Sequence, residues 1–364
     1  MTGRPGGVLL AFEGYGAEPT GAERMALRAA EQLAGRGWSV AVLSTAAQPA
    51  TRAALATAGV PVVGSAAELA RVRPGWTPAV VHGFDLARPE PLQEAVRVAQ
   101  RFRARFVLTP CSAPQVWPDR AAAGRICAAA AVVFVISQPE ARALPELGVP
   151  AGRIRLVPHA ADLVGTPRPA AFRQRYGLAG PVVLYLGRRA GFKGYRTLLE
   201  ATREVWARLP GTGFVFIGPD TDPAAPAAFA AHADPRVLDL GVAGEQTKHD
   251  ALAACDLLCL PTTADVFPLV FIEAWLSGKP VVSGDFPGAG EVVRHGVDGL
   301  VVRSAPGPVA AALVELLADP GRRAAMGEAG RRRADREFGW SRVADAYEAG
   351  YRAEQPAPTG REAR

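Results

Sequence analysis

The sequence is poor in the residues that crosslink small secreted folds or build metal clusters. Its 364 residues include four cysteines and five histidines, and no two cysteines form a CxxC pair. A disulfide framework or a Cys/His zinc site is therefore not expected. A reduced cytosolic protein is the simplest interpretation of the four thiols, which are Cys111, Cys127, Cys255 and Cys259.

Long apolar runs are missing as well. The longest, at 126–136, is too short to span a bilayer. The first residues, MTGRPGGVLLAFEGYG, predict a short strand that runs into a glycine loop, without the extended apolar region or small-residue cleavage site of a signal peptide. We therefore expect a soluble, cytoplasmic protein.

Signatures of nucleic-acid binding are absent too, because no helix-turn-helix, zinc-finger or RNA-binding sheet pattern is found. The formal net charge of +6 fits an anionic substrate or weak peripheral contact with an acidic membrane surface. Arg97, Arg101 and Arg105 repeat every four residues, as in a membrane-facing stripe or, the favoured interpretation, a solvated helix face. The arginine run 331–333 predicts a further exposed helix surface.

The chain does contain the material for two packed cores. Hydrophobic residues make up 49% of it, and 364 residues exceed the usual size of a single core. Short apolar runs alternate with longer amphipathic stretches such as 21–36 and 91–103, which is typical of βα units around a parallel sheet. The strands expected in the first half are 8–12, 40–44, 79–82, 106–109, 132–137 and 155–157. Those expected in the second half are 182–186, 213–217, 237–240, 257–260, 280–283 and 299–302.

A proline-rich stretch at 158–169 predicts a linker between the two halves. We therefore expect two doubly wound α/β domains, an N-terminal one over 1–165 and a C-terminal one over 170–339, and a disordered tail at 356–364. Ligands of such sheets bind outside the carboxyl ends of the strands. The expected site is a cleft between the two domains.

The densest motif, PTTADVFPLVFIEA, begins at Pro261 directly after an expected strand. A helix is expected to begin near Leu269, and the free N–H groups and positive dipole end of a helix start suit a diphosphate. Asp265 and Glu273 are eight residues apart, one before this helix and one inside it. They can therefore flank one ligand, with Glu273 accepting from two vicinal ribose hydroxyls and Asp265 meeting the hexose.

A second motif, LGRRAGFKG, also follows an expected strand. Arg188 and Lys193 are cations on a glycine loop that starts at Gly187, and they can neutralise charge on a leaving diphosphate. Taken alone, either motif is explained about as well by a turn and a solvated charged loop. Their occurrence together in one α/β half favours the functional interpretation.

The two motifs resemble those of the retaining GT-B glycosyltransferases of family 4, whose C-terminal domains carry a G-R-x4-K-G loop and an E-x7-E loop and helix. The segment TGAER at 20–24 is similar to the opening glycine loop of that family, and VVH at 80–82 is similar to its D-V-V-H strand end. LGVP at 147–150 and PHAAD at 158–162 resemble its run into the linker. FGW at 338–340 heads the last helix, expected at about 340–355, which in this family crosses back onto the N-terminal domain.

The resemblance implies a role for each matching position. Arg188, Lys193 and Asp265 are implied as catalytic residues, the cations binding the donor's phosphates and the carboxylate contacting the transferred sugar. The implied donor-binding residues are Gly21, Gly187, Phe267, Leu269, Val270 and Glu273. His82 and Cys111 are candidates for the acceptor side, although a histidine at a strand end that only caps a loop is an equal alternative for His82. The family works with net retention and without a metal, and the departing phosphate oxygen takes the acceptor's proton.

Four positions depart from the family pattern. Asp265 replaces the usual Glu, and Pro268 stands where Gly is common and removes one backbone donor. Cys111 stands where the family's T-x-H step has a histidine, and His159 replaces the usual Asn of the linker motif. These changes leave the diphosphate site intact and leave the identity of the sugar and the acceptor open.

The expected function is transfer of a sugar from a nucleotide-diphosphate sugar, with UDP as the expected nucleotide, to a small-molecule, glycolipid or saccharide acceptor, without a metal or another cofactor. Asp220 and Asp222 match a DxD metal motif, but their proline-rich surroundings favour a solvated acidic turn. Two alternatives stay open. One is a sugar-nucleotide epimerase of the same fold, and the other is a catalytically weak nucleotide-sugar-binding subunit, motivated by Cys111 and Asp265.

Overall fold

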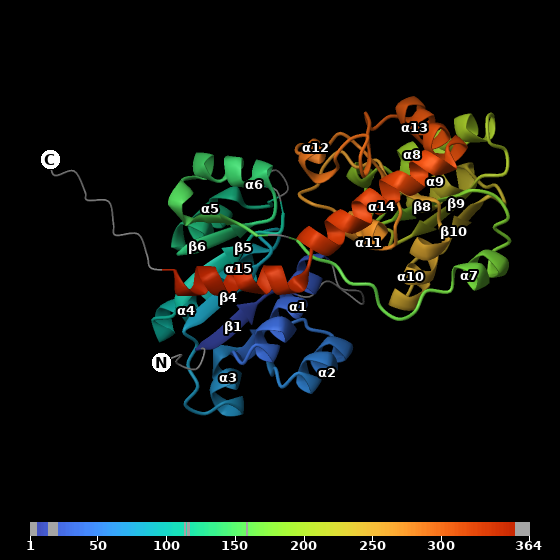
Figure 1. Cartoon of the computed structure of the whole chain (residues 1–364). Helices are drawn as coiled ribbons and strands as arrows, with labels where there is room; N and C mark the ends of the chain where they lie inside the picture. Colours follow the sequence, from blue (N-terminus) through green and yellow to red (C-terminus); the bar gives the residue numbers. More distant parts are fainter. Residues whose placement is uncertain (1–5, 14–20, 113, 115–116, 158, 354–364) are drawn as a thin grey trace. The chain divides into compact units, whose positions relative to one another are not determined.

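The structure is a computed structural model and describes residues 6–13, 21–112, 114, 117–157 and 159–353. The expected tail at 356–364 and most of the expected opening loop, residues 14–20, lie outside the described residues. The chain divides into two compact units (Figure 1). One comprises the residues up to His159 together with those from Trp340 onward, and the other comprises Ala160–Gly339.

The first unit is built on a parallel sheet with the strand order β3-β2-β1-β4-β5-β6-β7. The central strands are buried on both faces, as expected where helices cover both sides of a parallel sheet. The strands are β1 (Gly7–Ala11), β2 (Ser39–Leu43), β3 (Val62–Val63), β4 (Val80–Phe84), β5 (Arg105–Thr109), β6 (Val132–Val135) and β7 (Ile154–Leu156). The α-helices are α1 (Gly21–Gly35), α2 (Pro49–Thr57), α3 (Ala66–Val72), α4 (Pro89–Phe102), α5 (Arg120–Ala129), α6 (Gln138–Ala143) and α15 (Trp340–Arg352).

The second unit repeats this plan with a parallel sheet in the order β10-β9-β8-β11-β12-β13. Every residue of β8, β9 and β11 is buried, and the second unit has its own apolar core. The strands are β8 (Val182–Leu186), β9 (Gly213–Ile217), β10 (Val237–Asp239), β11 (Leu257–Leu260), β12 (Val281–Ser283) and β13 (Gly299–Val301). The α-helices are α7 (Pro169–Arg175), α8 (Tyr195–Trp206), α9 (Ala225–Ala231), α10 (Glu245–Ala254), α11 (Leu269–Leu276), α12 (Ala289–Val292), α13 (Pro306–Ala318) and α14 (Pro320–Glu337).

These two sheets confirm the expected α/β class with two doubly wound units. The expected strands are all present, with ends that differ by at most two residues, whereas the two-residue strand β3 was not predicted. No helix of the described residues is long and apolar enough to cross a membrane. The strand order reverses once in each sheet, between β1 and β4 and between β8 and β11. Such reversals are where doubly wound sheets hold their ligands, at the carboxyl ends of the two neighbouring strands.

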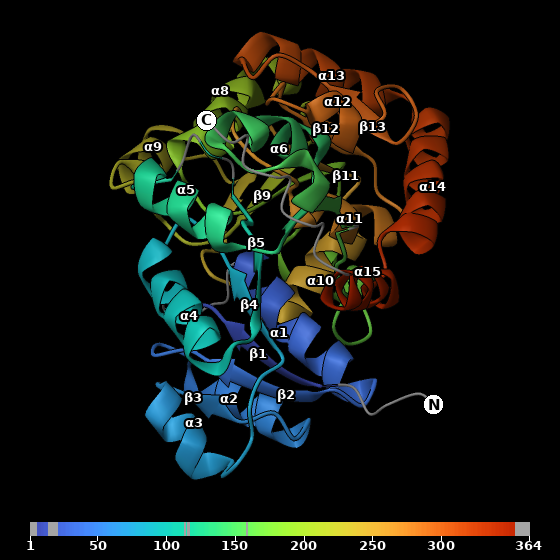
Figure 2. The same ribbon diagram turned by 90° about the vertical axis from the view of Figure 1, so that its left-hand side faces the viewer.

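The last helix returns to the first unit, as expected. Figures 1 and 2 both show α15 beside α1, and the two helices are in contact. Arg36, just after α1, pairs with Asp345 at 2.5 Å, and the Trp38 indole N–H donates to Glu348 at 3.0 Å.

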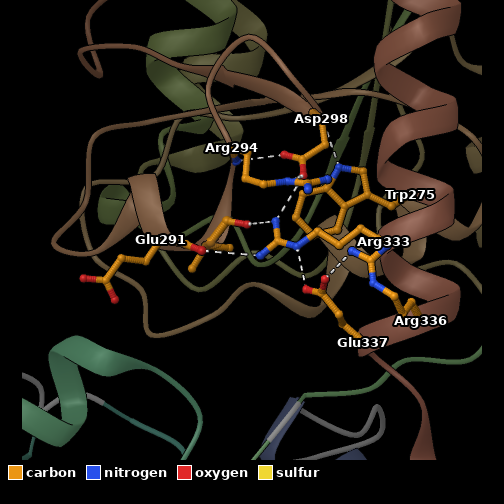
Figure 3. A network of polar contacts seen from close by, with 8 residues as sticks. Trp275, Glu291, Arg294, Asp298, Arg333, Arg336 and Glu337 are labelled. Atoms are coloured by element: carbon orange, nitrogen blue, oxygen red, sulfur yellow. Dashed lines mark hydrogen bonds and ion pairs between the residues drawn. The ribbon is translucent and has the colours of Figure 1, made fainter.

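A polar network in the second unit fixes α14 against the segment around α12 and β13 (Figure 3). The Arg333 guanidinium, from α14, donates to Asp298 Oδ2 at 3.1 Å and pairs with Glu337 at 3.0 Å. Asp298 is fully buried and also accepts from Arg294 Nε at 2.6 Å. The expectation that the arginines at 331–333 form an exposed surface is therefore wrong for Arg333, because helical rotation turns it inward while its two neighbours stay exposed.

Replacing Arg333 by leucine is expected to lower the free energy of unfolding by about 3 kcal/mol, because the buried carboxylate of Asp298 loses one of its two cations. The matched control is Arg332→Leu, whose side chain is 63% exposed and whose loss should change stability by less than about 0.5 kcal/mol. Urea unfolding followed by circular dichroism measures both. Equal destabilisation by the two variants would contradict the buried role of Arg333.

Candidate active site

The two sequence motifs of the second unit meet at the reversal point of its sheet. Strands β8 and β11 are parallel neighbours, so the loops that follow them, 187–194 and 261–268, leave the same edge. The Phe192 carbonyl of the first loop accepts from the Thr263 N–H at 2.8 Å and from the Thr262 hydroxyl at 3.0 Å. The structure therefore brings the two predicted segments into direct contact.

Gly194 makes this contact sterically feasible. Its φ of 76° lies in the left-handed region, and it precedes the first residue of α8. A Cβ at this position would lie 2.1 Å from the Pro261 carbonyl oxygen, closer than any real Cβ contact. Only glycine therefore lets the loop pass so close to the end of β11.

Arg188 and Arg189 are adjacent but have opposite environments. Arg188 is exposed, and its guanidinium forms no hydrogen bond or ion pair within the described part of the chain. Arg189 is buried and pairs with Asp220 at 2.7 Å and with Asp239. The loop is thus anchored to the residues that follow β9 and end β10, while the side chain of Arg188 stays exposed.

Lys193 and Asp265, both implied as catalytic residues, are bonded to each other. Lys193 Nζ lies 2.5 Å from Asp265 Oδ2, and the two side chains are 16% and 14% exposed. The other carboxylate oxygen of Asp265 accepts the N–H of Val266 at 3.0 Å. A diphosphate that binds Lys193 must therefore share the ammonium group with Asp265.

The start of α11 supplies backbone donors at the same edge. The first N–H groups of a helix, here those of Leu269 and Val270, have no acceptor within the helix. Pro268 precedes them and gives no side-chain cap, and together they form the positive end of the helix dipole. Phe267 is half-buried, and its ring packs edge-to-face on Phe338, with 5.3 Å between the ring centroids.

Glu273 lies one turn further into α11 and is 2% exposed. Its Oε1 accepts from Lys248 Nζ at 2.9 Å, and Lys248 also pairs with Glu245 at 2.7 Å. Lys248 and Glu245 both belong to the first turn of α10. Sequence reasoning missed Lys248, because a lone lysine in a polar helix start carries no signal that it is buried.

The two aspartates of the DxD motif are each held by an arginine. Asp220 pairs with Arg189, and Asp222 accepts from Arg196 at 2.9 Å and from the Tyr195 hydroxyl at 2.8 Å. No group of three potential metal ligands occurs among the described residues. The two carboxylates therefore serve the β8–α8 loop in this structure, rather than standing free in a solvated turn.

In the first unit, His82 lies inside the core. It is fully buried in β4, with Nδ1 2.7 Å from the Tyr351 hydroxyl and Nε2 2.8 Å from the Thr109 hydroxyl. Burial lowers the pKa of His82 well below its ordinary value, so the ring is neutral. This geometry favours a structural role, which here is the docking of α15 rather than the capping of a loop.

Gly21 is the first residue of α1, which follows β1 after the residues outside the described part. Cys111 follows β5 with φ of 58°, and Asp85 follows β4 with φ of 73°. Positive φ is uncommon for residues other than glycine, and such strain clusters at binding sites. Burial, with Asp85 and Glu140 nearby, raises the pKa of the Cys111 thiol well above its ordinary value, so it is protonated and a poor nucleophile.

The four cysteines are all free, as expected. Cys127, Cys255 and Cys259 are buried in the two cores, where burial raises the pKa of Cys127 and Cys255 to about 12. They are thus apolar packing residues.

Two doubly wound units, a last helix that returns to the first unit, and a cationic loop beside a helix start define the GT-B class of enzymes. The family comparisons agree for both units. The family described as "Glycosyl transferase 4-like domain" matches residues 20–160, and the family described as "Glycosyl transferases group 1" matches residues 180–319. Both units of the chain thus match glycosyl transferase families.

Relatives with assigned activities are similar over part of the chain. The D-inositol 3-phosphate glycosyltransferase of Segniliparus rotundus is 36% identical over 217 residues, 55% of this chain and 47% of that protein. The GDP-mannose-dependent alpha-(1-6)-phosphatidylinositol monomannoside mannosyltransferase of Mycobacterium tuberculosis is 33% identical over 236 residues, 58% of this chain and 59% of that protein. The chain thus spans about half the length of the curated relatives it matches.

Solved structures share the fold over nearly the whole chain. HepE of Anabaena, in complex with UDP and glucose, has a TM-score of 0.79 at 21% identity and covers 94% of this chain and 98% of its own. The sucrose-phosphate synthase of Thermosynechococcus elongatus has a TM-score of 0.75 at 22% identity, over 96% of this chain and 98% of its own. At this identity the likeness shows the fold.

Proposed function

We propose that this chain is a glycosyltransferase that moves a sugar from a nucleotide-diphosphate sugar to a small-molecule, glycolipid or saccharide acceptor. The observation that carries the proposal is the contact between the loops after β8 and β11. It gathers two cations, a helix start and two carboxylates at one edge of one sheet. Positive groups at that edge suit a diphosphate, and the carboxylates suit the hydroxyl groups on either side of it.

In this proposal the groups of the second unit act on the donor. Arg188, Lys193 and the N–H groups of Leu269 and Val270 stabilise the charge that grows on the departing diphosphate. Asp265 and the N–H of Phe267 hold the transferred sugar, Glu273 holds the ribose, and the backbone at Gly187 lies near the phosphates. The acceptor hydroxyl attacks the anomeric carbon from the face that the diphosphate leaves, so the configuration is retained. As the bond between this carbon and the phosphate oxygen breaks and the new glycosidic bond forms, that oxygen takes the proton of the hydroxyl. NMR of the product's anomeric centre tests retention, and an inverted product contradicts it.

UDP is the proposed nucleotide, supported by the likeness to HepE, whose structure contains UDP. GDP is the competitor, because the M. tuberculosis relative is GDP-mannose-dependent by name. A thermal-shift panel of nucleoside diphosphates and nucleotide sugars separates the two. A ligand at a hundred times its dissociation constant raises the free energy of unfolding by about 2.7 kcal/mol. A larger shift with GDP contradicts the choice of UDP, and no shift with any nucleotide contradicts the proposal itself.

The acceptor is assigned to the first unit, at the carboxyl ends of β4 and β5. Asp85 is 8% exposed there, and its Oδ1 accepts the N–H of Ala87 at 2.9 Å and the Ser112 hydroxyl at 3.3 Å. Asp85 follows β4 at the reversal point of this sheet, and Cys111 follows the neighbouring strand β5; both have positive φ.

We also propose a cytoplasmic location, with weak peripheral contact to a membrane surface. The arginine stripe at 97–105 is interrupted, because α4 ends at Phe102 and Arg105 lies in β5.

Activity is expected to survive chelation by EDTA. Arg188, Lys193 and the start of α11 place positive charge where a divalent cation acts in metal-dependent transferases. Donor turnover with and without EDTA, followed by release of the nucleoside diphosphate, measures this. Complete loss of turnover that Mg²⁺ restores would revive Asp220 and Asp222 as metal ligands.

Asp265 is expected to select a donor other than plain glucose, such as an amino, deoxy or pentose sugar. It is one methylene shorter than the family's Glu, which moves the carboxylate back by about 1.5 Å, and in this structure it is held by Lys193. A sugar hydroxyl that bonds a Glu would then be out of hydrogen-bond range. The measurement is kcat/KM for nucleotide sugars that share one base, in the parent and in Asp265→Glu. The hypothesis is wrong if glucose is the preferred sugar of the parent and the variant leaves the ranking unchanged.

The binding-subunit alternative rests on Cys111 and Asp265, and turnover of the donor separates it from an enzyme. Slow donor hydrolysis by the purified protein supports the transferase. Donor binding without turnover, whatever acceptor is offered, supports the binding subunit. An epimerase of the same fold would convert the sugar while it stays on the nucleotide, which the same assay detects.

A further inference from the structure

A buried lysine stands behind the carboxylate that is proposed to hold the ribose. Lys248 is 6% exposed, and buried lysines are rare unless they are paired. Its ammonium group lies 2.9 Å from Glu273 Oε1 and 2.7 Å from Glu245 Oε2. The lysine thus joins α10 to α11 through Glu273, which belongs to the candidate active site, and it pairs within α10 with Glu245.

Burying the charges of Lys248 and Glu273 removes them from water, which is unfavourable for folding. The side chains of Lys248 and Glu273 are 7% and 3% exposed, and replacing a buried ion pair by apolar residues is often neutral or stabilising. Stability alone therefore gives a weak reason for placing the pair here. Orientation gives a stronger one, because an ammonium on one oxygen fixes the plane in which the carboxylate accepts its other hydrogen bonds.

The acceptor capacity of the carboxylate allows both partners at once. An ionised carboxylate has about four lone-pair sites on two oxygens, so a bond from Lys248 does not prevent it from accepting from further donors. Glu245 in turn ties the ammonium to the first turn of α10, with 35% of its own side chain exposed. The chain of contacts is therefore from Glu245 through Lys248 to Glu273.

We propose that Lys248 is a positioning residue for the nucleotide, which orients Glu273 toward the ribose 2′- and 3′-hydroxyls. The inference rests on the proposed function, because it assumes that Glu273 binds the ribose. It predicts that removing the lysine weakens the contribution of the two hydroxyls specifically. A lysine that only supports the core would lower stability and leave that contribution unchanged.

The test compares each nucleotide with its 2′,3′-dideoxy form, using UDP and GDP as probes in calorimetric titrations of the full chain. In the parent, loss of both hydroxyls should weaken binding by about 10- to 100-fold for the better nucleotide. In Lys248→Met the intact nucleotide should bind about 10-fold more weakly, and the dideoxy penalty should fall below about threefold. Glu245→Gln, which loosens the lysine without removing it, should give an intermediate penalty.

The matched control is Arg168→Met, which removes an ion pair to Asp250 of the same helix at 3.1 Å and does not touch Glu273. Its dideoxy penalty should equal that of the parent. A parental penalty that persists unchanged in Lys248→Met overturns the positioning role and leaves the ribose assignment standing. A parent with no penalty at all overturns the ribose assignment, and the inference falls with it. Should Lys248→Met fail to fold, Glu245→Gln decides, and an unchanged penalty there overturns the role.

Discussion

Replacing Arg188 or Lys193 by alanine is expected to lower kcat by about two to three orders of magnitude and to raise the KM of the donor far less. The charge that these cations meet is greatest when the glycosidic bond is breaking, so they stabilise the transition state more than the bound donor. Arg188 is exposed, so its loss removes no side-chain hydrogen bond or ion pair among the described residues. Lys193→Ala also releases Asp265 from its ion pair.

The control for this prediction is Arg196→Ala, which removes a cation from the first turn of α8, the helix that follows the loop of Arg188 and Lys193. Arg196 pairs with Asp222 at 2.9 Å and is 48% exposed, so its loss should change kcat by less than about twofold. Steady-state kinetics with varied donor concentration measure all three variants. A pure KM effect, with kcat intact, would show that Arg188 and Lys193 only dock the donor.

Replacing Glu273 by glutamine is expected to weaken binding of the nucleoside diphosphate by about 10- to 100-fold, independently of the sugar. Hydrogen bonds to a charged carboxylate are worth about 1.5–3 kcal/mol, and the amide offers a neutral acceptor in its place. Glutamine keeps the shape of the side chain, and Lys248 keeps Glu245 as its counter-ion. Calorimetric titration with UDP and GDP measures the loss.

A matched control is Glu315→Gln on the surface of α13, where the side chain is 46% exposed and pairs with Arg322. This variant should bind both nucleotides like the parent. Equal affinities in the parent and in Glu273→Gln would remove the ribose assignment, although the diphosphate assignment would survive it.

The sequence was sufficient for the strands, because buried parallel strands are short apolar runs that turn residues separate. Strand β3 was not predicted, because its two residues, Val62–Val63, are too few to form a recognisable apolar run. That the two site loops leave the same edge of one sheet could also be predicted, since both follow strands of one restarted α/β pattern. Their contact through the Phe192 carbonyl and the glycine at 194 could not, because strand order decides which loops are neighbours.

The partners of the charged side chains could not be predicted from the sequence. Lys193 with Asp265, Lys248 with Glu273 and Arg189 with two aspartates are pairs separated by 25 to 72 positions in the chain. Such pairs leave no periodic pattern, because each side chain looks like an ordinary surface charge in its own segment. Arg333 shows the same limit, since nothing in a run of three arginines indicates which one the helix turns toward the core.

The most direct test of the central claim is a calorimetric comparison of nucleoside, nucleoside monophosphate and nucleoside diphosphate, in the uridine and guanosine series. If the loops after β8 and β11 form a diphosphate site, the diphosphate of the preferred base should bind at least about 10-fold more tightly than the monophosphate, and Arg188→Ala should remove most of that difference. Equal affinity for the mono- and diphosphate in both series, or a difference that Arg188→Ala leaves intact, would contradict the account.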